Sequence, residues 1–168
     1  FPYTTLFRSE GAIAALIAET GGINAMLVDA TALPEQVADD VVTSAFRSAG
    51  QRCSALRVLC VQDDVADRVL TMLKGAMAEY SLGNPERLST DIGPVIDQEA
   101  REGLLAHIQQ LKSEGRLIAE ARLPEGLNGH FVAPVAFEID GIHQLKKEHF
   151  GPVLHVARYD AADLEKVV

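Results

Sequence analysis

The chain of 168 residues is 48% hydrophobic, which is enough to bury the core of one domain. Its 24 acidic and 15 basic residues give a formal net charge of −9. Nucleic acid and anionic membranes bind clustered Lys and Arg, so this charge argues against both as partners. No apolar run is long enough to span a bilayer and no secretory signal pattern opens the chain, so we expect no membrane insertion.

Two cysteines, Cys53 and Cys60, are too few for a disulfide framework. If the residues between them are extended, the two thiols lie roughly 20 Å apart, which is beyond the reach of a disulfide. A reducing cytoplasm is therefore the expected compartment. The five histidines are scattered without the spacing of metal ligands, so we expect no metal site.

In chain order, residues 1–9 differ in composition from the sequence that follows. We interpret them as a remnant of cloning or sequence assembly, with a genuine N-terminal arm as the alternative. Residues 12–18 are small and apolar, which predicts a buried strand that delivers Glu19 to a turn at Gly21-Gly22. Residues 24–29 form a second apolar run, which is also predicted to be a strand.

A helix is expected next, beginning at residue 31 or 32 and reaching Phe46, because apolar residues recur there at helical spacing. Gly50 ends this pattern, Cys53 follows three residues later, and residues 56–61 read as a buried parallel strand. A cysteine on so tight a connection is held rigidly, which suits a nucleophile because a thiol has a useful anionic fraction near neutral pH. The alternative for Cys53 is a small buried core residue.

Two carboxylates stand in comparable positions. Glu19 follows an apolar run and precedes a glycine turn, which favours a functional role over a solvated loop carboxylate. Glu148 stands beside Lys146-Lys147 and before Gly151-Pro152, and by itself it could be one more surface charge.

The remaining sequence alternates helices and strands. Asp63-Asp64 is expected to cap a helix that reaches about Tyr80, and Asp97 is expected to cap a helix over residues 98–114. A last helix begins near Asp160. Strands are predicted over residues 116–122, 131–139 and 153–158.

Three motifs occur in a meaningful order: Glu-Thr-Gly-Gly at 19–22, Gly-Gln-Arg-Cys at 50–53 and Glu-His-Phe-Gly-Pro at 148–152. In this order and spacing they resemble the aldehyde dehydrogenase superfamily, from about Glu10 to the last residue. The flanks of Cys53 resemble most the branch that oxidises glutamate semialdehyde, and within it the dehydrogenase module of the bifunctional proline utilization proteins. Ser48 replaces the asparagine common at this point in the wider superfamily, which is part of the reason for favouring this branch.

The resemblance implies an α/β fold, in which residues 10–168 are a fragment of the parallel-sheet catalytic domain. It implies that Cys53 is the catalytic nucleophile that carries a thioester, and that Glu19 is the general base that activates the hydrolytic water. Glu148 would accept hydrogen bonds from the ribose hydroxyls next to the nicotinamide, and Phe150 would pack against the nicotinamide. Ser54 is a candidate contact for the carboxylate of the substrate.

The resemblance also implies partners. The substrate would be a small-molecule aldehyde and the cofactor NAD, whose binding region lies mostly upstream of Glu19 in the family. FAD would occur only in a separate proline dehydrogenase domain, if the parent protein is bifunctional, and the parent enzyme would be a homo-oligomer. The chain alone is expected to be inactive. Two alternatives stay open: a dehydrogenase for another aldehyde, and a folded fragment that does no catalysis.

Overall fold

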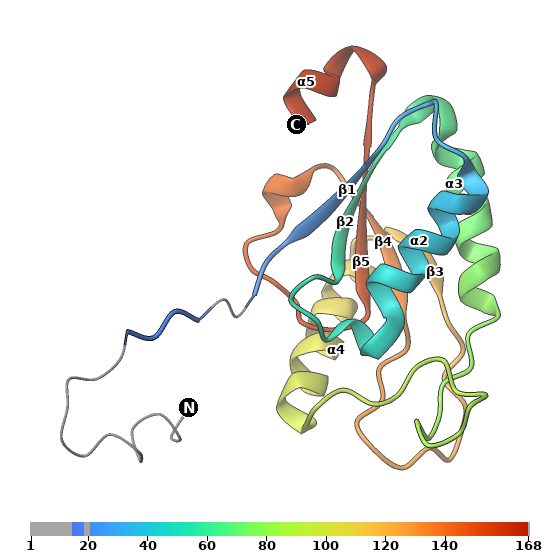
Figure 1. Ribbon diagram of the computed structural model, residues 1–168, viewed down its shortest axis with the longest axis vertical. Coiled ribbons are helices and arrows are strands. Elements are labelled where there is room, and N and C mark those ends of the chain that lie inside the picture. Colours follow the sequence, from blue (N-terminus) through green and yellow to red (C-terminus); the bar gives the residue numbers. More distant parts are fainter. Residues whose placement is uncertain (1–14, 19–20, 168) are drawn as a thin grey trace.

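The computed structural model describes residues 15–18 and 21–167, which build one mixed α/β sheet structure. The sheet has the strand order β1-β2-β5-β4-β3. β1, β2, β5 and β4 pair in parallel, whereas β3 runs antiparallel to β4. Its strands are β1 (Asn24–Val28), β2 (Leu56–Gln62), β3 (Leu117–Glu120), β4 (Val135–Ile139) and β5 (Val153–Tyr159). The predicted α/β class with a mainly parallel sheet is confirmed (Figure 1).

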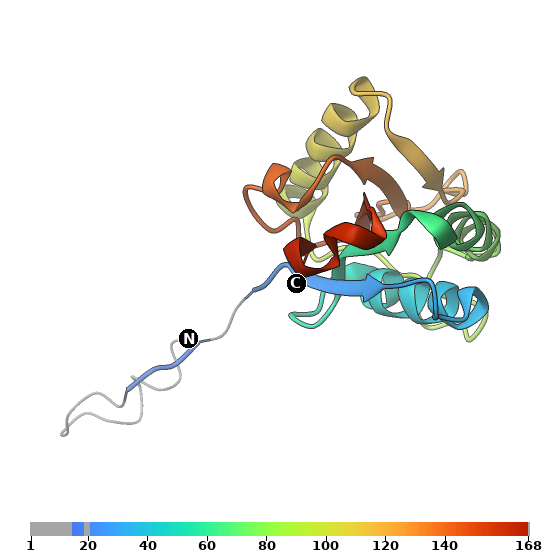
Figure 2. The ribbon, with the colours of Figure 1, turned by 90° about the horizontal axis from the view of Figure 1, so that it is seen from above.

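Helices cover both faces of this sheet. α2 and α3 pack on one side and α4 packs on the other, as the view from above shows (Figure 2). The helices are α2 (Pro34–Phe46), α3 (Asp63–Ala78), α4 (Gln98–Ser113) and α5 (Leu164–Val167). Short 3-10 turns add η1 (Arg47–Gly50), η2 (Ile142–Gln144) and η3 (Ala161–Asp163).

Strand β2 is buried along its whole length. Leu59 belongs to the large apolar cluster that packs against α2 and α3. Its neighbours Val58 and Cys60 belong to a smaller cluster with β4 and β5 residues. Because successive side chains of a strand point to opposite faces, Leu59 faces one side of the sheet, whereas Val58 and Cys60 face the other. A strand buried on both faces explains the continuous apolar run.

Of the two predicted helix caps, one is confirmed and the other is wrong. The Asp97 side chain accepts a hydrogen bond from the Ala100 backbone N–H at 2.8 Å, so the predicted cap of α4 is confirmed. The predicted cap at Asp63-Asp64 is wrong in its chemistry. α3 does begin at Asp63, but its start has no side-chain cap, and the Asp63 carboxylate accepts from Arg158 Nε on β5 at 2.8 Å.

The N-terminal expectations fall largely on undescribed residues. Residues 1–9 and Glu19 lie outside the described part of the chain. Of the strand expected over residues 12–18, residues 15–18 are described and are not in a strand. The strand expected over residues 24–29 is present as β1, one residue shorter at its end.

Candidate active site

The predicted site residues gather where three neighbouring strands begin. Gly21-Gly22 precede β1, Cys53 precedes β2, and Glu148 precedes β5. These strands are parallel and adjacent, so the segments that enter them meet at one edge of the sheet. This is the lower edge in Figure 1, opposite the edge from which α3 and α5 continue.

A left-handed turn brings the chain from α2 to Cys53. Ser48, Ala49 and Gly50 have φ angles of 57°, 51° and 64°. Glycine adopts this conformation freely, whereas serine and alanine pay for it in conformational energy. At Gly50 there is no room for a side chain, because an added Cβ would collide with the carbonyl of Gly151 and approach Ala45. The turn therefore depends on close backbone packing against the segment that follows Glu148.

Side chains from distant segments hold the turn in place. Asn24 on β1 donates from Nδ2 to the carbonyls of Cys53 at 2.6 Å and Ala55 at 3.0 Å. Gln51 accepts from the Ile96 N–H at 2.7 Å and donates to the Pro94 carbonyl at 3.3 Å. The backbone beside Cys53 is thus fixed from two directions, as a nucleophile requires.

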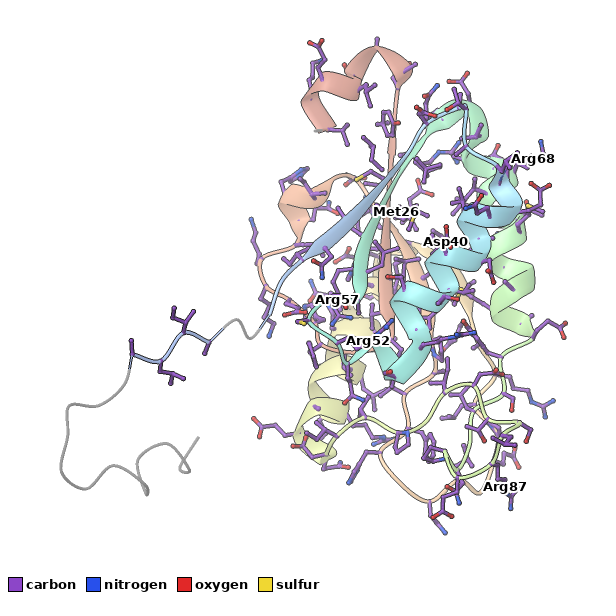
Figure 3. The ribbon with its side chains drawn as sticks, in the orientation of Figure 1. Met26, Asp40, Arg52, Arg57, Arg68 and Arg87 are labelled. Carbon is purple, nitrogen blue, oxygen red and sulfur yellow. The ribbon has the colours of Figure 1, made fainter. Side chains whose placement is uncertain are left out.

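Arg52, next to Cys53, binds the end of α2. Its Nη2 donates to the carbonyls of Thr43 at 3.2 Å and Ser44 at 3.3 Å (Figure 3). These carbonyls belong to the last turn of α2, where the helix dipole favours a positive charge. Arg52 therefore joins the turn to the helix that precedes it.

The two thiols have different surroundings. Cys53 is exposed and Cys60 is buried, and neither forms a disulfide. Burial raises the pKa of the Cys60 thiol above its ordinary value, because the thiolate would lose its hydration. Cys53 is thus the accessible thiol, as a nucleophile must be. Ser54, the predicted substrate contact, is also exposed in the same turn.

Glu148 is joined to Gly21 and Gly22, where the turn predicted from the sequence is not present among the described residues. Its Oε2 accepts from the Gly22 backbone N–H at 3.0 Å. An added Cβ at Gly21 would lie 2.5 Å from this oxygen, so the glycine permits the close approach. Gly22 also lies close to the Cys53 carbonyl, which is 3.9 Å from the position that its Cβ would take. The structure therefore brings together Cys53, Glu148 and the second half of the Glu-Thr-Gly-Gly motif.

Arg57 is the residue of this site that the sequence reading missed. It is 2% exposed, and its Nε donates to Glu148 Oε1 at 3.1 Å. Its guanidinium carbon lies 5.1 Å from the centre of the Phe150 ring, which is 40% exposed. A signal was available, because a charged residue inside a continuously apolar strand needs a buried partner.

Three histidines form a second cluster beside Glu148. His155 Nδ1 lies 3.1 Å from the Arg57 carbonyl, and His155 Nε2 lies 2.9 Å from His107 Nε2. Since a carbonyl only accepts, His155 carries its proton on Nδ1, and its Nε2 accepts from His107. The rings of His107 and His149 stack with centroids 3.4 Å apart.

This cluster is electrically neutral at neutral pH. Burial, followed by the charges of His149, His155 and Lys147, lowers the pKa of His107 to about 3. Burial and the charges of His155, Lys147 and Arg57 lower the pKa of His149 to about 4. The pKa of His155 is also lowered, mainly by burial. Because both rings are neutral, His107 can donate its Nε2 proton to His155 Nε2 without charge repulsion.

Comparison with known proteins assigns the chain to a family. Residues 6–168 match the aldehyde dehydrogenase family. The chain belongs to this family. The resemblance seen in its three motifs is therefore confirmed.

The similar proteins include PutA proteins and 1-pyrroline-5-carboxylate dehydrogenases. The chain is 58% identical to the bifunctional protein PutA of Klebsiella aerogenes, over 91% of the chain and 12% of that protein. It is 36% identical to the 1-pyrroline-5-carboxylate dehydrogenase of Geobacillus kaustophilus, over 85% of the chain and 28% of that protein. A crystal structure of bifunctional proline utilization A superposes with a TM-score of 0.87 at 59% identity, covering 95% of the chain and 16% of that structure. The chain thus spans a small part of the relatives that it matches.

The described residues offer part of a site for the cofactor of this family. Glu148 is 17% exposed, and its two oxygens keep acceptor capacity beyond the bonds to Arg57 and Gly22. Such an acceptor suits ribose hydroxyls, and the half-exposed Phe150 ring beside it suits the face of a nicotinamide. These residues fit the nicotinamide end of a dinucleotide.

The described residues contain neither a metal-binding cluster nor a membrane-spanning helix. No group of three or more His, Cys, Asp or Glu side chains among them is arranged to hold a metal ion. No helix in residues 15–18 and 21–167 combines the length and the apolar content needed to cross a membrane.

Proposed function

We propose that the chain is part of an enzyme that oxidises L-glutamate γ-semialdehyde to L-glutamate with NAD. The observation that carries this proposal is the meeting of the Cys53 turn and Glu148 at one sheet edge, in a chain 58% identical to a PutA protein. Because the chain spans 12% of that relative, the activity is proposed for the complete enzyme. The 168-residue chain alone is proposed to be inactive, since it would lack most of the cofactor site.

In this reaction Cys53 attacks as a thiolate and adds to the aldehyde carbon, forming a thiohemiacetal. The backbone N–H of Cys53 would support the oxyanion, and Ser54 would bind the carboxylate of the substrate. NAD supplies the acceptor for the hydride that leaves the thiohemiacetal carbon. Loss of the hydride converts the Cys53 adduct into a thioester. Glu19 then removes a proton from water, which attacks the thioester and releases glutamate and the Cys53 thiolate.

Further proposals concern the complete protein. We propose that it carries FAD only if a separate proline dehydrogenase domain is present, and that it is a homo-oligomer that binds a small-molecule aldehyde. Two thiols without a disulfide support a cytoplasmic location. We also propose that residues 10–168 are a portion of its catalytic domain and that residues 1–9 are not native.

The test separates covalent bond formation from hydrolysis. In the full-length enzyme, rapid mixing of glutamate semialdehyde and NAD with Cys53→Ala should yield neither NADH nor a thioester. Glu19→Gln should give a burst of NADH followed by slow turnover, since loss of a general base costs about 10²–10⁴-fold in rate. Cys60→Ala is the matched control, because Cys60 is a buried thiol of the following strand, and it should keep the unmodified rate.

Several results would contradict the proposal. Turnover by Cys53→Ala would remove Cys53 as the nucleophile, and unchanged turnover by Glu19→Gln would remove Glu19 from hydrolysis. Loss of the burst in Glu19→Gln with unchanged binding would instead assign Glu19 to the activation of Cys53. An aldehyde without a carboxylate that reacts with the higher kcat/KM would contradict the substrate assignment.

A further inference from the structure

A single buried guanidinium connects the two halves of the candidate site. Arg57 is the second residue of β2, and it is 2% exposed in a strand whose other residues are mostly apolar. Burying an arginine costs free energy unless each of its donors has a hydrogen-bond partner. The partners of Arg57 therefore indicate why an arginine occupies this position. Burial lowers the pKa of Arg57, and its bond with Glu148 opposes that change.

On one side Arg57 holds the cofactor segment. Its Nε and Nη2 both lie 3.1 Å from Glu148 Oε1, and its Nη1 donates to the Gly151 carbonyl at 3.1 Å. Its face also lies over the Phe150 ring, at 5.1 Å from the ring centre. The same side chain therefore contacts Glu148, Phe150 and Gly151.

On the other side Arg57 reaches the turn of the nucleophile. Its Nη2 donates to the carbonyl of Arg52, the residue before Cys53, at 3.4 Å. Its backbone carbonyl accepts a hydrogen bond from His155 Nδ1 on the neighbouring strand β5 at 3.1 Å. Arg57 is thus anchored in the core while its guanidinium bridges the two segments.

We propose that Arg57 is a positioning residue that presets the Glu148 carboxylate and the Phe150 ring for the nicotinamide riboside end of the cofactor. The inference rests on the proposed function, because that function assigns the cofactor to this edge of the sheet. A free glutamate side chain loses much rotamer freedom when it binds a ligand. Arg57 removes this cost beforehand, because it holds Oε1 and leaves acceptor capacity on Oε2 for a hydroxyl donor.

The experiment uses the full-length enzyme and a double-mutant cycle of Arg57→Met and Glu148→Gln. Equilibrium titration with NAD should show that Arg57→Met weakens binding by about 10- to 100-fold, as expected for lost hydrogen bonds to a charged group. In the Glu148→Gln background the same change should alter NAD affinity by less than about twofold, because the group that Arg57 positions has already been altered. Arg57→Lys should fall between Arg57→Met and the unmodified enzyme.

A second measurement needs no cofactor. Alkylation of Cys53 by iodoacetamide, without NAD, should keep its rate within about twofold in Arg57→Met, because Asn24 and Gln51 still hold the turn. Arg158→Met is the matched control. Arg158 lies on the neighbouring strand and pairs with two carboxylates, Asp63 and Asp67, and its loss should leave NAD affinity unchanged.

Two results would overturn the inference. Additive effects of the two substitutions would show that Arg57 does not act through Glu148. Changed alkylation with unchanged NAD affinity would place Arg57 with the nucleophile instead. If Arg57→Met does not accumulate as folded protein, Arg57→Lys takes its place in the cycle and is judged by the same criteria. NAD affinity is measured without an aldehyde, so an error in the proposed substrate would appear separately, as normal NAD binding without oxidation of glutamate semialdehyde.

Discussion

Lowering the pH from about 7.5 to about 5.5 should destabilise the fold through the histidine cluster of His107, His149 and His155. In the folded chain the pKa of His107 is lowered to about 3 and that of His149 to about 4, from an ordinary value of 6.5. Between these pH values the histidines of the unfolded chain therefore become protonated, whereas His107 and His149 of the folded chain stay neutral. Stability that is fully present above about pH 6.5 is lost as the pH falls below it.

The size of the effect follows from the number of protons. A histidine that is protonated only after unfolding changes the free energy of unfolding by at most about 1.4 kcal/mol over this range. His107 and His149 are partly exposed, so solvent screening reduces their share to a total of about 1–2 kcal/mol. Carboxylates with a lowered pKa, such as Asp140, lose their contribution only at lower pH.

Urea unfolding of the 168-residue chain, followed by circular dichroism at both pH values, measures this difference. In His107→Gln, whose amide can still donate to His155, the difference between the two pH values should fall by roughly half. His143→Gln is the matched control, because His143 is exposed, and it should leave the difference unchanged. A free energy of unfolding that stays constant or rises at pH 5.5 would refute the neutral cluster.

Three further outcomes are expected. Iodoacetamide should label the exposed Cys53 before the buried Cys60 in the folded chain, and peptide mapping that found the reverse order would contradict the assignment of the accessible thiol. Gly50→Ala should lower the free energy of unfolding by at least about 1 kcal/mol, because Gly50 has a φ of 64° and the added Cβ would collide with the Gly151 carbonyl. Unchanged stability would mean that the turn can relax. Ser48→Asn should raise the free energy of unfolding by about 0.5–1 kcal/mol, because asparagine tolerates the left-handed region better than serine, and a lower urea midpoint would contradict this reading.

The elements that the sequence predicted well are those with a local signal. The apolar run at residues 56–61 became β2, buried along its whole length. Asp97 before an apolar periodicity predicted a capped helix, and its side chain makes that bond. The stop at Gly50 was also local, since its left-handed conformation favours glycine. Patterns of this kind depend on neighbours within a few residues.

The contacts that escaped prediction join residues that are far apart along the chain. Arg57 and Glu148 are 91 residues apart, and nothing near either residue indicates its partner. The histidine cluster joins a helix residue, a loop residue and a strand residue, so no ligand-like spacing exists in the sequence. The motif resemblance placed Cys53 and Glu148 together, but it could not supply the side chain that connects them.

The contacts behind Cys53 have a consequence for how substitutions in this region should be judged. Asn24, Gln51 and Arg52 all bind carbonyl oxygens of the backbone, which every amino acid possesses. The donors are therefore constrained while the partners are free to vary, and Thr43 or Ser44 could be replaced without loss of a bond at that point. A variant at a donor position should be treated as damaging even when its partner position tolerates many residues.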